Sequence, residues 1–305
     1  MSLPTQGDNT QLDTVQSYVY RGTESGTHLL LLGGVHGNEI CGQHALIDLK
    51  KELDSGALRL SKGTLTIVPY ANPRACAASC RYLEENLNRV IKHHATPIAY
   101  EEKLGAQIAA LIDSCDVTVD IHSTSTYCPS PFVFNMYPAP ENDKLCYALG
   151  GEFVVKNWLE MLDEHATHLF SATNIYAHQS GKTATVIECG QHDETSSLQV
   201  AARAVRNAMK LYGLIPGEVE PPNIKGDIVA KKAYVKKAEG RMLSPDWHHL
   251  MPVKEGTVIA QYDHGEKLVI PQDGYLLLPA HYATVGDEWF YFGRLENTPT
   301  TTLTT

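Results

Sequence analysis

The chain has 305 residues, with 25 Lys and Arg against 35 Asp and Glu, so its formal net charge is −10 when the 14 His are neutral. A chain of this length favours one large domain or two unequal ones. The apolar share of 43% allows a sizeable core and argues against global disorder. An acidic balance disfavours a nucleic-acid-binding protein, which needs a basic face to displace counterions.

No stretch reaches the roughly 20 apolar residues of a membrane helix, and the N-terminus lacks the basic and apolar regions of a secretory signal. Seven cysteines are spread through the chain without a Cys-x-x-Cys pair, which argues against a disulfide framework or a Cys-rich zinc knuckle. We therefore expect a cytoplasmic protein with reduced, mostly buried thiols and no membrane association.

Short apolar runs alternate with helical patterns through the first two thirds of the chain. Strands are predicted at 29–32, 64–69, 116–121 and 183–187, and helices at 40–53, 101–112 and 197–212. Nearly continuous apolar strands that alternate with helices indicate an α/β sheet covered on both faces.

The pattern changes at 214–222, where paired prolines and a glycine mark a linker. Beyond it the sequence predicts strands at 227–235, 257–262, 268–270, 275–278 and 289–292, separated by Gly turns. We predict an α/β catalytic domain over residues 1–212 and a smaller, mainly β domain over 213–305, with a frayed tail at 298–305.

The strongest local signal is the sequence GGVHGNE at residues 33–39. A predicted strand ends there in a glycine turn and delivers His36 and Glu39 to the carboxyl edge of the sheet, where open α/β sheets bind ligands. Because a His near a helix start is common, this pair alone is a weak signal. His122 directly follows another strand, and two His with one Glu predict a zinc site that leaves one position open for water.

Two carboxylates follow strands in the same way. Asp120 lies two residues before His122 and could orient a neighbouring group. Glu188 ends the strand at 183–187, and a carboxylate at the end of a buried strand is costly unless it has a task. We predict that Glu188 acts as general base toward water and then as general acid toward the leaving amine.

Arg74, Arg81 and Arg89 fall within 16 residues of one another in a protein with little positive charge. Arginine binds carboxylates bidentately, so this segment is expected to hold a substrate carboxylate. The alternative is a solvated loop face with Glu84 and Glu85 as partners, and it applies most strongly to Arg74.

Four segments, in this order and spacing, resemble the succinylglutamate desuccinylase/aspartoacylase family of the zinc carboxypeptidase-like superfamily, and aspartoacylase in particular. They are GGVHGNE (33–39), NPRACAASCRYLEENLNR (72–89), DIHSTST (120–126) and VIECG (186–190). The resemblance extends through the segments at 244–250 and 261–266 of the second domain. It implies a three-layer α/β/α domain with a mostly parallel mixed sheet, and a β domain over the mouth of the site.

Members of that family hydrolyse the amide of an N-acyl amino acid. The resemblance implies one Zn²⁺ per chain, held by His36, Glu39 and His122. It implies that Glu188 activates water, and that Arg81 polarises the scissile carbonyl and stabilises its oxyanion.

The resemblance also implies which residues bind the substrate. Asn88 and Arg89 would clamp its carboxylate, and a tyrosine of the β domain would contact it, for which Tyr282 is the candidate. The implied partner is therefore a small N-acyl amino acid. Because the family contains dimers, a homodimer is an expectation as well.

The chain departs from the family at two points. The family's aspartate two residues before the Asn-Arg pair is Asn86 here, which removes a charge near Arg81. Aspartoacylases also carry an arginine shortly before the catalytic glutamate that reads a second substrate carboxylate. Residues 171–183 contain no Arg; His178 lies where it would fall, with Lys182 nearby. Because His is mostly neutral at pH 7, N-acetyl-aspartate is disfavoured relative to a neutral or aromatic acyl amino acid or a different dicarboxylate.

Two alternatives stay open. A carboxypeptidase-like metallopeptidase could use the same ligand set on short peptides, because the Asn-Arg pair also suits the C-terminal carboxylate of a peptide. A non-catalytic relative could keep the pocket only to bind a metal or ligand.

Overall fold

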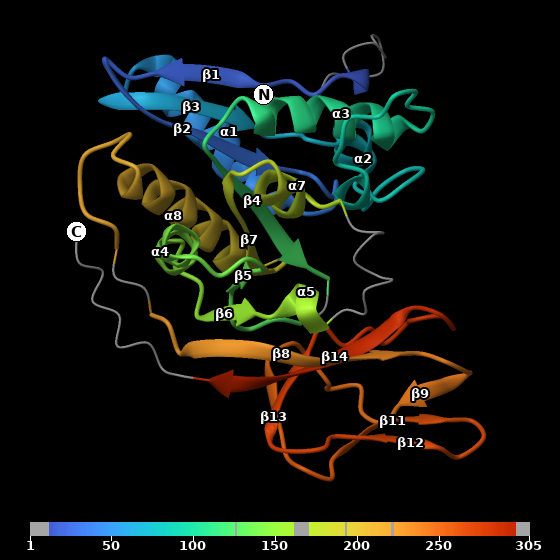
Figure 1. Ribbon diagram of the computed structural model, residues 1–305. Helices are drawn as coiled ribbons and strands as arrows, with labels where there is room; N and C mark the ends of the chain where they lie inside the picture. The colour runs from blue at the N-terminus through green and yellow to red at the C-terminus, as the bar shows by residue number, and fades with distance from the viewer. Residues whose placement is uncertain (1–11, 126, 162–170, 193, 221–222, 297–305) are drawn as a thin grey trace.

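The computed structural model describes residues 12–125, 127–161, 171–192, 194–220 and 223–296. An eleven-stranded sheet organises the molecule (Figure 1), in the order β1-β3-β2-β4-β7-β5-β6-β8-β14-β13-β10. Its strands are β1 (Tyr18–Arg21), β2 (Glu24–Gly33), β3 (Lys62–Val68), β4 (Val117–Thr124), β5 (Phe132–Asn135), β6 (Phe153–Lys156), β7 (Thr183–Gln191), β8 (Gly226–Val235), β10 (Met251–Val253), β13 (Gly274–Leu277) and β14 (Glu288–Glu296). A second sheet contains β9 (Gly240–Met242), β11 (Val258–Tyr262) and β12 (Lys267–Val269).

Helices connect and cover these strands. They are α1 (Ile40–Ser55), α2 (Pro73–Ala78), the 3-10 helix η2 (Leu87–Arg89), α3 (Tyr100–Asp113), α4 (Pro140–Ala148), α5 (Trp158–Met161), α7 (Thr173–Gln179) and α8 (Thr195–Leu211). The mixed α/β fold with a large, mostly parallel sheet is confirmed: β3, β2, β4 and β7 are parallel neighbours, as are β5, β6 and β8, while β5 runs antiparallel to β7.

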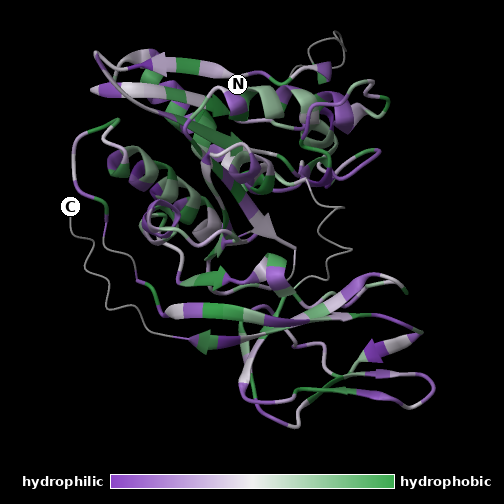
Figure 2. Ribbon diagram, in the orientation of Figure 1, coloured by the Kyte–Doolittle hydropathy of each residue, from purple (hydrophilic) through white to green (hydrophobic). Residues whose placement is uncertain are grey.

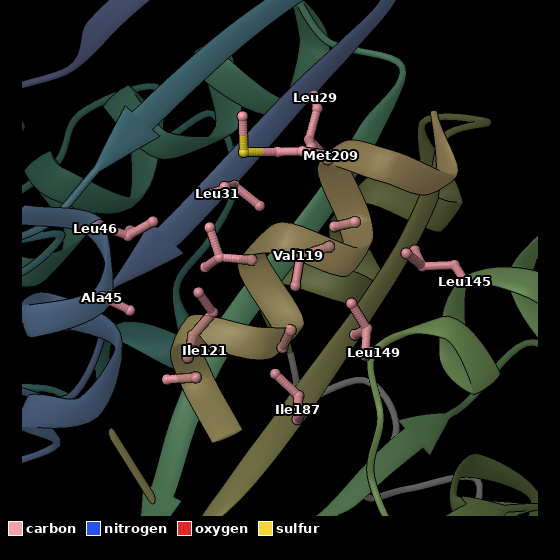
Figure 3. Close-up of a cluster of buried hydrophobic side chains, with 14 of the residues drawn as sticks. Leu29, Leu31, Ala45, Leu46, Val119, Ile121, Leu145, Leu149, Ile187 and Met209 are labelled. Atoms are coloured by element: carbon pink, nitrogen blue, oxygen red, sulfur yellow. The ribbon is translucent and has the colours of Figure 1, made fainter. Parts of the chain in front are cut away.

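The buried half of β2 shows why its sequence is apolar without alternation. Leu29 and Leu31 point into a core with α1, α4 and α8, whereas Leu30 and Leu32 point into a second core with α3 and the alanine of α7. Figure 3 shows Met209 of α8 beside these strands on the first face. Figure 2 colours the end of β2 hydrophobic, while the covering helices carry both hydrophobic and hydrophilic residues. The sheet is therefore buried on both faces, as a parallel sheet requires.

The large sheet continues into the C-terminal part of the chain. β8 pairs in parallel with β6, and β14 then pairs antiparallel with β8. At this junction Lys156 Nζ donates to Asp227 Oδ2 over 2.7 Å, and the Tyr147 hydroxyl donates to the same oxygen over 2.9 Å. The domain boundary between 212 and 213 stays a prediction, and the hydrogen-bonded ladder crosses it.

The predicted helices correspond to α1, α3 and α8, and the predicted strands include the short β12 and β13, whereas β1, β5, β6, α4 and α7 had no prediction. β5 and β6 are each four residues long, which is too short for a recognisable period. β12 and β13 are equally short, but they lie in a segment without helical patterns where Gly turns separate the strands. In the described part of the chain, no helix has the length and apolar character to cross a membrane. The predicted tail at 298–305 lies outside the described residues.

Candidate active site

Two glycines shape the turn that carries His36 and Glu39 between β2 and α1. Gly34 has a φ of +64°, a left-handed conformation that favours glycine. A Cβ on Gly37 would lie 2.1 Å from the carbonyl carbon of Ala75, so this position admits no side chain. The turn therefore packs against α2 and presents both side chains at the carboxyl edge of the sheet, the edge toward which β4 runs in Figure 1.

The structure brings His36, Glu39 and His122 together in one buried cluster. One donor atom from each lies within 4.8 Å of the others. Glu39 Oε1 lies 2.8 Å from His36 Nδ1, and Glu39 Oε2 lies 2.8 Å from His122 Nδ1. The two Nδ1 atoms are 3.1 Å apart.

Outer partners turn these nitrogens toward one another. The Asn86 side-chain carbonyl lies 3.1 Å from His36 Nε2 and accepts its proton. On the other imidazole, His122 Nε2 lies 2.8 Å from Asp120 Oδ2. Such contacts leave Nδ1 of each ring available as a ligand, which is how metal-binding histidines are held. The two nitrogens and one carboxylate therefore fit a zinc ion.

Charge is strongly coupled within this cluster. Burial alone would raise the pKa of Glu39, but the imidazoles of His36 and His122 hold it well below the usual value. Burial also lowers the pKa of His36. For His122 burial acts in the same direction, yet the carboxylates of Asp120 and Glu39 raise its pKa well above the usual value. The cluster thus keeps an ionised carboxylate ready for a cation.

Glu188 stands on β7 directly opposite His122 on β4. Its Oε2 atom is buried without a hydrogen-bond partner among the described residues. Burial, followed by the negative charge of Glu39, raises the pKa of Glu188 to about 8. A carboxyl group that exchanges its proton near neutral pH is suited to general acid–base chemistry.

A cavity of about 170 Å³ joins the cluster to the substrate-binding candidates. Its described lining consists of His36, Arg81, Asn88, Arg89, His122, Phe134, Met136, Trp158, Leu159, Ala172, Asn174, Ile175, Val186, Glu188, Leu278 and Tyr291. The lining thus includes the predicted metal-binding, proton-transfer and carboxylate-binding residues, and most of the other lining residues are apolar or aromatic. This is the usual composition of a site for a small molecule.

Arg81, Asn88 and Arg89 reach this cavity from the segment after α2. Arg81 Nη1 donates to Glu39 Oε1 over 2.9 Å, so its guanidinium lies at the His36–Glu39–His122 cluster. Asn88 is buried, and its side-chain carbonyl accepts the Thr173 backbone N–H over 3.0 Å. Arg89 Nη1 donates to the backbone carbonyl of Asn88 over 2.9 Å.

Glu101 of α3 holds the loop that carries Arg81 and Asn86. Its carboxylate is fully buried and accepts three successive backbone N–H groups, from residues 83, 84 and 85, at 2.7, 3.2 and 3.1 Å. The Asn72 amide donates to it as well, over 3.3 Å. One buried carboxylate therefore fixes a loop with little other structure of its own.

Two candidates for substrate binding, Tyr282 and His178, do not lie at the cavity. Tyr282 is 97% exposed and lies in a separate depression with Trp247 and His281. His178 is exposed and stacks on Tyr137 with the ring centroids 3.6 Å apart. Their roles in substrate binding stay predictions.

Arg74 also faces away, because it pairs with Asp13 and its guanidinium lies 4.8 Å from the centroid of the Tyr100 ring. Lys182 does not line the cavity either. Arg74 thus lies outside the cavity, as the loop-face alternative expected, but its acidic partner is Asp13 and not Glu84 or Glu85.

Two polar lining residues escaped prediction. Tyr291 of β14 is the tyrosine that the C-terminal region contributes to the cavity, and Asn174 is the polar side chain that α7 contributes. The family's arginine lies shortly before the catalytic glutamate, and this spacing pointed to His178. In the structure that stretch contains the end of α7 and the turn to β7, and Asn174 from the first turn of α7 lines the cavity instead. Tyr291 lies in the strand predicted at 289–292, but nothing in that sequence singles it out for the cavity, and Asn174 had no signal either.

Comparison with known proteins assigns the chain to a family. The model of the succinylglutamate desuccinylase/aspartoacylase catalytic domain matches residues 25–212. The chain belongs to this family.

Similar proteins of described activity support the same assignment. N-alpha-acetyl-L-2,4-diaminobutyric acid deacetylase of Halomonas elongata is 28% identical over 286 residues, which cover 89% of this chain and 81% of that protein. N-acyl-aromatic-L-amino acid amidohydrolase (carboxylate-forming) of Mus musculus is 34% identical over 106 residues, 30% of this chain and 32% of that protein. Both names describe hydrolysis of N-acyl amino acids.

A solved structure shows the same fold. A succinylglutamate desuccinylase/aspartoacylase structure from Rhodobacter sphaeroides superimposes with a TM-score of 0.75 at 19% identity, covering 92% of this chain and 90% of that one.

Proposed function

We propose that this protein is a zinc-dependent amidohydrolase that cleaves the acyl-amide bond of an N-acyl amino acid. The observation that carries the proposal is that Glu188 shares one small cavity with the buried His36–Glu39–His122 cluster and with two arginines. The family assignment and the activities named for its relatives support the same class of reaction.

A zinc ion held by His36, Glu39 and His122 would act as a Lewis acid and lower the pKa of water to about 7. The residues of the chain supply the proton transfers. Glu188 takes a proton from the attacking water and delivers it to the amide nitrogen as the C–N bond breaks. The pKa of Glu188 is about 8, and a nearby cation would lower it toward neutral pH, where the carboxylate can accept a proton.

The two arginines that line the cavity have different roles in this proposal. Arg81, which touches the metal cluster, lies where negative charge develops on the scissile carbonyl oxygen, and removal of one such donor typically costs about 3–4 kcal/mol of transition-state stabilisation. Arg89 and Asn88 bind the α-carboxylate of the substrate. The small cavity and its apolar wall suit an amino acid with a short acyl group.

The direct test combines metal analysis with an activity screen. Purified protein should contain about one zinc per chain, lose activity with a chelator and regain it with added zinc. The screen should include N-acetyl amino acids with anionic, cationic, neutral and aromatic side chains, together with unacylated dipeptides. Turnover confined to the dipeptides would identify a peptidase and contradict the proposal.

Two variants test the residue roles. Glu188→Gln should lower kcat by about 10²–10⁴-fold while zinc stays bound, and His122→Ala should lose the zinc itself. Glu194→Gln, a change of an exposed glutamate just after β7, is the matched control and should behave as wild type. Full activity in Glu188→Gln would rule out its role as the general base.

A further inference from the structure

Asn174 is a buried amide with nothing to bind. Asn174 is 1% exposed and lines the cavity. Neither its Oδ1 nor its Nδ2 has a hydrogen-bond partner among the described residues. Buried side-chain amides are almost always paired, because leaving one unpaired removes it from water without compensation. An amide with both ends unpaired, on the wall of a binding cavity, indicates a ligand that pairs with it.

The backbone that carries Asn174 is fixed by the contacts of its neighbour Thr173. Thr173 donates its hydroxyl to Asp120 Oδ2 over 2.6 Å and its backbone N–H to Asn88 Oδ1 over 3.0 Å. Asp120 in turn contacts the metal ligand His122. The first turn of α7 is thus fixed to both the metal cluster and the carboxylate-binding segment. Asn174 is held in position before substrate arrives, which limits the entropy lost on binding.

The charges of the cavity limit what Asn174 can meet. Apart from the imidazoles of the metal cluster, the cationic side chains of the described lining are Arg81 and Arg89. The proposed reaction uses Arg81 at the scissile carbonyl and Arg89 at the α-carboxylate. A second carboxylate on the substrate would therefore be buried against a neutral amide and apolar side chains such as Phe134 and Trp158, at a high desolvation cost.

We propose that Asn174 is a specificity-determining residue that hydrogen-bonds the side chain of the substrate amino acid and selects an uncharged polar group there, such as a carboxamide. This inference rests on the proposed function for the placement of the scissile amide and the α-carboxylate. A carboxamide offers a donor and an acceptor together and so pairs with both Oδ1 and Nδ2. A carboxylate offers only acceptors, and a thioether of the same length offers no donor.

The test measures binding on the zinc-loaded Glu188→Gln protein, so that no ligand is consumed. N-acetyl-L-glutamine, N-acetyl-L-glutamate and N-acetyl-L-methionine are similar in size and differ at the end of the side chain. Isothermal titration should show the glutamine compound binding about tenfold or more tighter than the other two. Adding Asn174→Leu should abolish that preference, whereas Gln179→Leu, on an exposed position of the same helix, should preserve it.

A second readout does not depend on ligands. Because Asn174→Leu removes an unpaired buried amide, the variant should unfold at the same or a higher temperature than its parent. Asn174→Ala, which cannot overfill the site, should lose the glutamine preference in the same way. If either folded variant keeps the preference, or if glutamate binds as tightly as glutamine, the inference is wrong.

Failure of the proposed function would look different. Selective binding of N-acetyl-L-glutamine without any turnover by wild-type enzyme would leave the role of Asn174 intact and contradict the hydrolase proposal. Turnover of the whole panel at similar kcat/KM would support the hydrolase and overturn the selectivity.

Discussion

At the scale of single residues, the site is a set of side chains whose protonation depends on one another. The sequence could predict His36, Glu39, His122 and Glu188 because each follows an apolar strand, and the carboxyl ends of parallel strands meet at one edge. It could not predict Asn174, because an amide has no periodicity or motif. Its significance appears only when the absence of partners is seen in three dimensions.

The raised pKa of Glu188 predicts how stability depends on pH when zinc is removed. The folded protein keeps the Glu188 proton up to about pH 8, whereas the unfolded chain releases it near the ordinary value of 4.5. The folded state therefore binds more protons across that window, and this group makes the free energy of unfolding fall as pH rises. In urea unfolding with a chelator, Glu188→Gln should gain a few kcal/mol over wild type as pH rises from about 5 to about 8. Parallel pH curves for the two proteins would contradict the shift.

Arg89 tests the carboxylate clamp. Arg89→Ala should raise KM by about tenfold or more with a smaller change in kcat, because a bidentate partner for the α-carboxylate is lost. Arg74→Ala is the matched control from the same segment, and its KM should stay at the wild-type value because Arg74 pairs with Asp13. An unchanged KM in Arg89→Ala would assign the carboxylate to another group.

At the scale of elements, long apolar segments were predictable, and the short strands that were predicted, β12 and β13, follow Gly turns. β2, β3, β4, β7, α1, α3 and α8 each contain enough residues for their burial pattern to show in sequence. β5, β6 and α7 owe their conformation to their neighbours: Phe132 of β5 pairs with Glu188 of β7, and α7 is fixed through Thr173. Tertiary contacts decide the structure of such short segments, so local patterns cannot reveal them.

Glu101 gives a prediction at this scale, because α3 uses it to hold the loop that carries Arg81. Glu101→Ala should lower the free energy of unfolding by about 2–3 kcal/mol, since three backbone N–H groups lose their acceptor. It should also lower kcat by releasing Arg81 from its position. Glu102→Ala, which removes the N-terminal acceptor of the same helix, should leave kcat unchanged. Equal kcat values in both variants would show that the loop keeps its place without Glu101.

At the scale of the whole molecule, the sequence suggested two domains, and the structure joins the two parts through one sheet. β6 and β8 pair through main-chain hydrogen bonds, and Asp227 binds Lys156 and Tyr147 across this junction. Composition changes at the linker could be read in the sequence. The strand pairing could not, because β6 is short and its partner lies about 70 residues later.

Asp227 therefore contributes to the cohesion of the two parts. Asp227→Ala should lower the free energy of unfolding by about 2–3 kcal/mol, because the largely buried Lys156 ammonium loses its closest carboxylate and, among the described residues, keeps only the neutral Tyr147 hydroxyl at hydrogen-bond distance. Hydrogen exchange should increase first at the amides of β6 and β8. Glu152→Ala breaks a more exposed pair with Lys225 at the same junction and should have a much smaller effect. Matching losses in the two variants would place the cohesion in the backbone ladder alone.

The order of strands in the sheet also determines when the site can form during synthesis. β7 is inserted between β4 and β5, although β5 and β6 precede it in the chain. Until residue 191 has been made, β4 and β5 lack their shared neighbour, and the edge of β4 that carries His122 is unpaired. Unpaired strand edges of this kind invite association with other chains. His36, Glu39 and His122 are thus synthesised well before β7, the strand that completes their side of the sheet, and we expect the nascent chain to be most exposed to misassembly in that interval.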